Sequence, residues 1–167
     1  MTIHTSHPFA EAFNEPERRF RGRLAARVSL WTAGADADRA GLTVSSQLVA
    51  MGEPWRIVAV LNPDSDLAEQ LQETGSAAIS LLSPEQRGLS DAFAGGPAPG
   101  GPFRLTDWEQ TQWGPVPVGQ PTWAGVELEE AKELGWQLLV TCKIAHVIIS
   151  DADEPLVNHR GRLKPLG

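Results

Sequence analysis

The order of strand-like and helix-like segments is the feature that most constrains the fold of this chain. Two well-marked helical patterns lie in the middle of the sequence, and strand-like segments gather toward both ends. Two helices are too few to cover a parallel sheet, in which each pair of strands needs a crossover connection. The order therefore favours a mainly antiparallel barrel with helices packed on its outside.

The strand-like segments are rich in apolar and β-branched residues and are bounded by turn residues. They span residues 24–32, 42–49, 55–61, 76–82, 123–134, 136–150 and 156–163. The two helices are expected over residues 64–73 and 83–93, where a capping residue precedes the helical segment. Gly75 is expected to end the first of these helices.

The chain length is compatible with one domain. Residues 1–15 show no periodicity and are expected to form a flexible N-terminal arm. Residues 16–167 are then expected to form a single domain, because 167 residues allow one sizeable core and are short for two. Pro16 can open a short helix, since proline is tolerated in a first turn.

Composition and charge exclude several classes of protein. A hydrophobic fraction of 41% with 21% charged residues is ordinary for a globular domain, and the net charge of −7 argues against a nucleic-acid partner. No apolar run approaches the roughly 18 residues that span a bilayer. The first 13 residues also lack the basic and then apolar order of a signal peptide. We therefore expect a cytoplasmic protein with no membrane partner.

Five arginines break the acidic balance near the start of the chain. They are Arg18, Arg19, Arg21, Arg23 and Arg27. Such a cluster can be a solvated helix face and strand edge. It can also attract a phosphorylated or anionic ligand, and both interpretations stay open.

The sequence contains no familiar catalytic or metal-binding constellation. There is no Gly-x-Ser-x-Gly segment, and neither His146 nor His159 lies near a nucleophile signal. Cys142 is the one cysteine and lies in an apolar run, so we expect it in the core rather than as a nucleophile. No His-x-x-x-His and no clustered histidines and carboxylates are present, and no metal site is predicted.

Two hydroxyl-rich segments follow strand-like runs. Thr43 and Ser45 alternate along one strand face and could meet a flat polar ring, although small residues also fill barrel rims. Ser65 stands at the start of the first helix, where free backbone N–H groups suit a phosphate. A serine at this position is also common as a plain helix cap, and the two roles can coexist. A ring site together with a phosphate site describes a mononucleotide cofactor.

These segments and three others, in this order, resemble the flavin reductase-like family, the FMN-binding split barrel. They are Val28-Ser29-Leu30-Trp31-Thr32, Gly41 to Ser46, Asn62-Pro63-Asp64-Ser65, Ser90-Asp91-Ala92-Phe93-Ala94-Gly95 and the closing segment Pro155 to Arg162. The match covers about residues 20–164. Each segment is weakly specific, and their common order carries the resemblance.

The resemblance implies a six-stranded antiparallel Greek-key split barrel with flanking helices, forming a homodimer with FMN near its interface. The serine segment would meet the flavin ring, Trp31 and Thr32 would flank it, and Ser65 with the helix start would meet the phosphate. Arg160 would supply positive charge. The cofactor-binding residues expected in this way are Trp31, Thr32, Gly41, Leu42, Thr43, Val44, Ser45, Ser46, Asn62, Ser65, Asp66, Leu67 and Arg160.

The resemblance also implies an activity, that of an NAD(P)H-dependent FMN reductase that supplies reduced flavin to a partner such as a flavin-dependent monooxygenase. FAD could replace FMN. No catalytic residue is expected, because the flavin itself carries the hydride chemistry. The alternative is a flavin-binding module or carrier without reductase activity, since Gly135-Trp136-Gln137 stands where many members have Gly-Asp-His.

Overall fold

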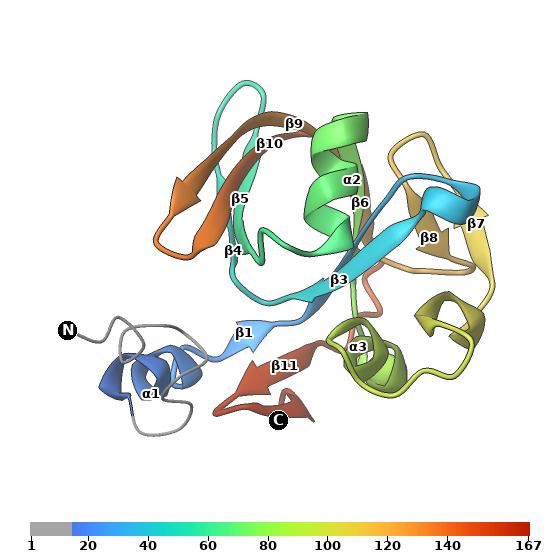
Figure 1. Cartoon of the computed structure of the whole chain (residues 1–167). Coiled ribbons are helices and arrows are strands. Elements are labelled where there is room, and N and C mark those ends of the chain that lie inside the picture. Colours follow the sequence, from blue (N-terminus) through green and yellow to red (C-terminus); the bar gives the residue numbers. More distant parts are fainter. Residues whose placement is uncertain (1–14) are drawn as a thin grey trace.

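A curled antiparallel sheet forms the centre of the molecule in the computed structural model, which describes residues 15–167 (Figure 1). The prediction of a flexible arm over residues 1–15 therefore falls almost wholly outside the described residues. The sheet has seven strands in the order β3-β2-β6-β9-β10-β5-β4. Their bounds are β2 (Ser29–Ala33), β3 (Ala40–Val44), β4 (Gln47–Ala50), β5 (Arg56–Leu61), β6 (Ser76–Leu81), β9 (Trp123–Leu134) and β10 (Gln137–Ile148). The mainly β, antiparallel architecture expected from the sequence is confirmed.

The main sheet has one strand more than the six expected, because the segment predicted as a single strand over 42–49 is divided. The chain leaves β3 at Ser45 and enters β4 after Ser46. β3 and β4 lie at opposite ends of the strand order, so these two serines carry the chain from one edge of the sheet to the other. A connection of two residues can do this only if the sheet curls until its edges approach each other.

Gln47 links the edge strand β4 to β2, which is the neighbour of the other edge strand, β3. Its Oε1 atom accepts hydrogen bonds from Ser29 Oγ at 2.9 Å and from Trp31 Nε1 at 3.0 Å. Ser29 and Trp31 lie on β2 and are fully buried, whereas Gln47 begins β4. The side-chain bonds thus span a gap that the backbone ladder leaves open.

Two smaller sheets lie beside the main one. β1 (Ala26–Arg27), β11 (Leu156–His159) and β12 (Arg162–Pro165) form a three-stranded sheet, and β7 (Trp108–Gln110) pairs with β8 (Pro115–Pro117). The strand expected over 24–32 is therefore broken at Val28, which lies between β1 and β2. The strand expected over 156–163 is instead a hairpin, because the chain turns at Arg160 and Gly161.

The described part of the chain has three α-helices, which are α1 (Pro16–Gly22), α2 (Asp66–Thr74) and α3 (Arg87–Phe93). Short 3₁₀ turns cover Asp36–Asp38, Pro84–Gln86 and Pro102–Leu105. Both expected helices are confirmed. Ser65 caps α2 by accepting a hydrogen bond from the Ala68 N–H, and Gly75 ends the helix in the left-handed conformation. The second expected helix begins as the 3₁₀ turn, where Ser83 and Gln86 form a capping box.

The interior consists of two apolar clusters. The larger lies between α2 and the curled sheet and contains Trp31, Leu71 and Cys142, so the expected core position of Cys142 is confirmed. Burial raises the pKa of this thiol to about 12, which leaves it inert at neutral pH. The smaller cluster joins α3 to β2 and β11 through Phe93, Leu30 and Leu156. No helix within residues 15–167 is long and apolar enough to cross a membrane.

Candidate functional site

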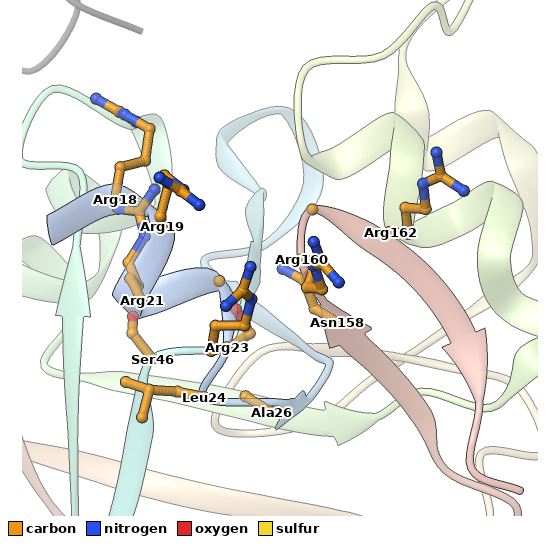
Figure 2. A pocket seen from close by; sticks show the side chains of 13 residues that line it. Arg18, Arg19, Arg21, Arg23, Leu24, Ala26, Ser46, Asn158, Arg160 and Arg162 are labelled. Atoms are coloured by element: carbon orange, nitrogen blue, oxygen red, sulfur yellow. The ribbon is translucent and has the colours of Figure 1, made fainter. Parts of the chain in front are cut away.

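A cavity of about 740 Å³ lies between α1, the β11–β12 hairpin and the crossing from β3 to β4 (Figure 2). Three distant parts of the chain supply its walls. The lining residues are Arg18, Arg19, Arg21, Gly22, Arg23, Leu24, Ala26, Ser45, Ser46, Asn158, Arg160, Gly161 and Arg162. Its volume falls within the range of about 300–1,000 Å³ that small-molecule sites occupy.

Backbone hydrogen bonds hold the walls together. β1 pairs with β11, with Ala26 opposite Asn158, and the Arg160 N–H donates to the Gly22 carbonyl at 2.7 Å. The end of α1 is thereby tied to the hairpin turn. On the third wall, Ser46 binds the end of β5, because its hydroxyl donates to the Val60 carbonyl at 2.7 Å and its carbonyl accepts from the Val60 N–H at 3.0 Å.

The charge of the cavity is positive. Among the described residues that line the cavity, six are arginines and none is acidic. Within residues 15–167, Arg18 is the lining arginine that forms a salt bridge, with Glu15 at 3.5 Å. Guanidinium groups bind phosphates and carboxylates through paired N–H donors, so the cavity is suited to an anionic ligand.

The structure brings three of the residues predicted from the sequence into this cavity. Ser45, Ser46 and Arg160 all line it, although they belong to different motifs. Arg160 has a φ of 55°, a left-handed conformation that is uncommon for residues other than glycine. The hydroxyl of Ser46 is already committed to Val60.

Two predicted ring contacts, Trp31 and Thr32, are fully buried instead. The indole N–H of Trp31 is bound by Gln47, and the Thr32 hydroxyl lies against the carbonyls of Ala78 and Pro115. Neither residue lines the cavity. Their contact with a flavin stays a prediction.

The remaining predicted residues of β3 face packed protein as well. A side chain at Gly41 would collide with the ring of Phe93, and the Thr43 hydroxyl donates to the Ser90 carbonyl at 2.6 Å. Leu42 packs against the larger core, and Val44 is buried in it. The prediction for these four residues is likewise untested by the geometry of the cavity.

The start of α2, predicted as the phosphate site, lies in a separate shallow hollow. That hollow is lined by Pro63, Asp64, Ser65, Glu69, Gln72 and Glu73. The Ser65 hydroxyl donates to the Asn62 carbonyl at 2.8 Å while it caps the helix, and the Asn62 side chain accepts from the Asp64 N–H. Asp66 is exposed and Leu67 is fully buried. Three carboxylates around this hollow disfavour an anion.

Sequence reasoning named the arginines of α1 without assigning them to the site. It also left out Asn158 and Arg162, which lie across the cavity from α1. The Arg-Gly-Arg sequence at residues 160–162 was the available signal for Arg162. A glycine favours a tight turn, and a turn at Gly161 places both arginines on one hairpin.

No cluster of three or more histidine, cysteine, aspartate or glutamate side chains that could hold a metal ion occurs in the described part of the chain. The donors around the cavity are serines, an asparagine and arginines. This set fits a phosphorylated organic cofactor.

The sequence model of a protein family, the flavin reductase like domain, matches residues 21–167 of this chain. The chain belongs to this family. The matched range takes in every wall of the cavity except the first arginines of α1.

Two curated relatives of this flavin reductase-like domain are similar over most of their length. The reductase component of 4-hydroxyphenylacetate 3-monooxygenase from Escherichia coli is 25% identical over 164 residues, which cover 92% of this chain and 94% of the relative. The FMN reductase (NADH) RutF from Ancylobacter novellus is 24% identical over 144 residues, which cover 86% of this chain and 80% of the relative.

Solved structures show the same fold. The NADH:FAD oxidoreductase SgcE6 of Streptomyces globisporus, in complex with NAD and FAD fragments, superposes with a TM-score of 0.82 at 18% identity and covers 94% of this chain and 98% of that chain. BorF, the flavin reductase component of a bacterial two-component tryptophan halogenase, has a TM-score of 0.79 at 22% identity, with 90% and 96% coverage. At these identities the likeness establishes the fold.

Proposed function

We propose that this protein is an NAD(P)H-dependent flavin reductase that supplies reduced flavin to a partner such as a flavin-dependent monooxygenase. The observation that carries the proposal is the arginine-lined cavity at Ser45, Ser46 and Arg160 within a flavin reductase-like domain. Relatives that are reductase components or FMN reductases by name support the activity. FMN is the proposed flavin, with FAD the alternative.

The residues of the cavity would bind and orient the cofactor. A bound flavin supplies the hydride-accepting ring. The chain at Ser45 and Ser46 would offer backbone groups and the Ser45 hydroxyl to the ring edge, and Arg160 would offer its guanidinium to the phosphate. Hydrogen-bond donors beside the ring would stabilise the negative charge of the reduced flavin, because the fold holds these donors in place before the reaction. No general base is needed.

The family barrel is proposed to act as a cytoplasmic homodimer with Greek-key connections. Support for a second copy comes from apolar side chains on the outside of β4 and the turn that follows it. Leu48, Val49, Met51 and Trp55 are between 49% and 82% exposed. Clusters of exposed apolar residues of this kind mark interaction surfaces. Light scattering after gel filtration tests the dimer, and a monomer at micromolar concentration would reject it.

Steady-state oxidation of NADH and of NADPH, with FMN and with FAD as acceptors, tests the activity. We expect nicotinamide oxidation that depends on added flavin. A protein that binds flavin but oxidises neither nicotinamide would be the second candidate, a flavin carrier. Gln137 in the place of the histidine common in the family, beside the half-exposed Trp136 at the β9–β10 turn, is the observation that favours this carrier.

A further inference from the structure

Five of the six arginines that line the cavity form no salt bridge within residues 15–167. They are Arg19, Arg21, Arg23, Arg160 and Arg162. The whole chain has a net charge of −7, so this local excess of positive charge is opposite in sign to the charge of the protein. Like charges held close together repel each other, and a bound anion offsets that repulsion.

The frame that holds these charges is fixed by the backbone. The hydrogen bond from the Arg160 N–H to the Gly22 carbonyl, at 2.7 Å, joins the two walls. Arg160 is one of two residues other than glycine with a positive φ in the described part of the chain, the second being Asp36. Strained conformations of this kind are concentrated at ligand sites.

The arginines stand on two walls rather than around one point. In the view of Figure 2, Arg19 and Arg23 extend from α1 on the side that faces Arg160, and Arg162 lies beyond Arg160 on the hairpin. The cavity of about 740 Å³ also reaches Ser45 and Ser46. A single phosphate would use only part of such a site. A pyrophosphate accepts paired N–H donors from two walls, and an adenine ring can stack on a guanidinium plane.

We infer that the α1 wall of this cavity binds the adenosine diphosphate half of a dinucleotide, with the pyrophosphate between Arg19, Arg23 and Arg160. The inference rests on the proposed function, because the other half of the dinucleotide would be the flavin or the nicotinamide. FAD, with its ring at Ser45 and Ser46, and NAD(P)H are the two sources of that shared group. FMN lacks it.

Calorimetric titration with ADP alone tests the subsite without any flavin. We expect ADP to bind the full chain, and the double variant Arg19→Gln/Arg23→Gln to weaken ADP by tenfold or more, since hydrogen bonds to charged groups are worth about a factor of ten each. The double variant Arg87→Gln/Arg104→Gln is the matched control. It removes the same charge from exposed arginines that do not line the cavity, and should leave ADP affinity unchanged.

Flavin affinities and the KM for NADH, measured in the wild type and in the Arg19→Gln/Arg23→Gln variant, identify which ligand carries the ADP group. If FAD binds more tightly than FMN and the α1 double variant removes that preference, the subsite serves the flavin. If the variant instead raises the KM for NADH without affecting reduced nicotinamide mononucleotide, the subsite serves the nicotinamide. Both results support the inference. Failure of ADP to bind, or equal loss of ADP affinity in both double variants, overturns it even if FMN binds. Absence of FMN, FAD and riboflavin binding overturns the proposed function instead.

Discussion

At the scale of single residues, the arginines of this chain divide into two kinds. Arg27 is fully engaged, because its guanidinium binds both oxygens of Asp153, at 2.7 and 2.9 Å, and also the Leu82 carbonyl. Arg56 forms a similar pair with Glu129. The cavity arginines Arg19 and Arg23 have no such partner among the described residues. The sequence shows Arg19, Arg23 and Arg27 as one basic cluster, and only the fold separates a structural arginine from those available to a ligand.

The Arg27–Asp153 pair predicts a pH-dependent contribution to stability. The hydrogen bonds from Arg27 and its charge hold the pKa of Asp153 below its usual value. The stabilisation is therefore present above the unfolded-state pKa of about 4 and is lost as the pH falls through the folded-state pKa. We expect Asp153→Asn to lower the free energy of unfolding at pH 7 by up to about 1 kcal/mol, because the pair is partly exposed.

Urea titrations at pH 7 and at low pH measure this effect. The difference between wild type and Asp153→Asn should shrink toward zero at low pH. Asp151→Asn, which removes an exposed carboxylate that forms no salt bridge within residues 15–167, should show no such trend. A difference that is constant with pH would contradict the account of Asp153.

Arg160 and Ser65 are two competing positions for the flavin phosphate. If Arg160 holds it, Arg160→Gln weakens FMN by about tenfold while riboflavin, which has no phosphate, is little affected. If the sequence-based assignment to Ser65 holds, Ser65→Ala shows this selective loss. We expect the first result, since Ser65 lies among carboxylates, and expect Ser65→Ala to cost about 1 kcal/mol of stability as a lost helix cap. Fluorescence quenching of both flavins by each variant measures the selectivity, and equal losses of the two flavins in Arg160→Gln would contradict our expectation.

At the scale of elements, local sequence signals predicted the helices well. The cap at Ser65, the stop at Gly75 and the capping box of Ser83 and Gln86 all act between neighbouring residues, so the sequence contains their whole cause. The divisions at Ser45–Ser46 and Arg160–Gly161 were missed. Both lie inside runs with good strand composition, and only pairing with distant strands decides where such a run breaks.

β9 contains a packing constraint that a single methyl group can test. A side chain at Gly125 would collide with the indole of Trp113, which stacks on His146 at a centroid distance of 5.0 Å. We expect Gly125→Ala to destabilise the protein by about 1–3 kcal/mol through overpacking. Gly88→Ala is the matched control, because its new methyl group meets no atom within 4 Å and should stabilise α3 by up to about 1 kcal/mol. Thermal unfolding of both variants measures the difference, and equal midpoints would show that Trp113 moves aside freely.

At the scale of the whole molecule, the curl of the sheet creates the site. β3 and β4 must meet at Ser45 and Ser46, and the same end of the curled sheet receives α1 and the closing hairpin (Figure 1). Ser45, Ser46 and Arg160 could be proposed from the sequence because each lies in a family-like motif. The arginines of α1 could not be assigned, since nothing local places residues 18–23 beside residues 158–162.

Closure of the curl predicts a role for Gln47 in the stability of the whole fold. Replacing it with alanine removes the acceptor of the buried Trp31 N–H, whereas the Ser29 hydroxyl retains the Val44 carbonyl. One unsatisfied buried donor costs about 1–3 kcal/mol, and we expect Gln47→Ala to lower the free energy of unfolding by that amount. Gln112→Ala, at an exposed position, should be neutral. A neutral Gln47→Ala in urea titration would mean that the backbone alone closes the curl.

The absorbance spectrum of the flavin-loaded protein, recorded without oxygen before and after one equivalent of NADH and then of NADPH, tests the central claim most directly. We predict a visible flavin band that is shifted from that of free flavin and bleaches with at least one nicotinamide. At a limiting protein concentration the change should be clearly smaller when arginine at position 160 is replaced by glutamine, because FMN then binds about tenfold more weakly. A protein whose cavity leaves the spectrum of added FMN and FAD unchanged would contradict the assignment of this cavity as a flavin site.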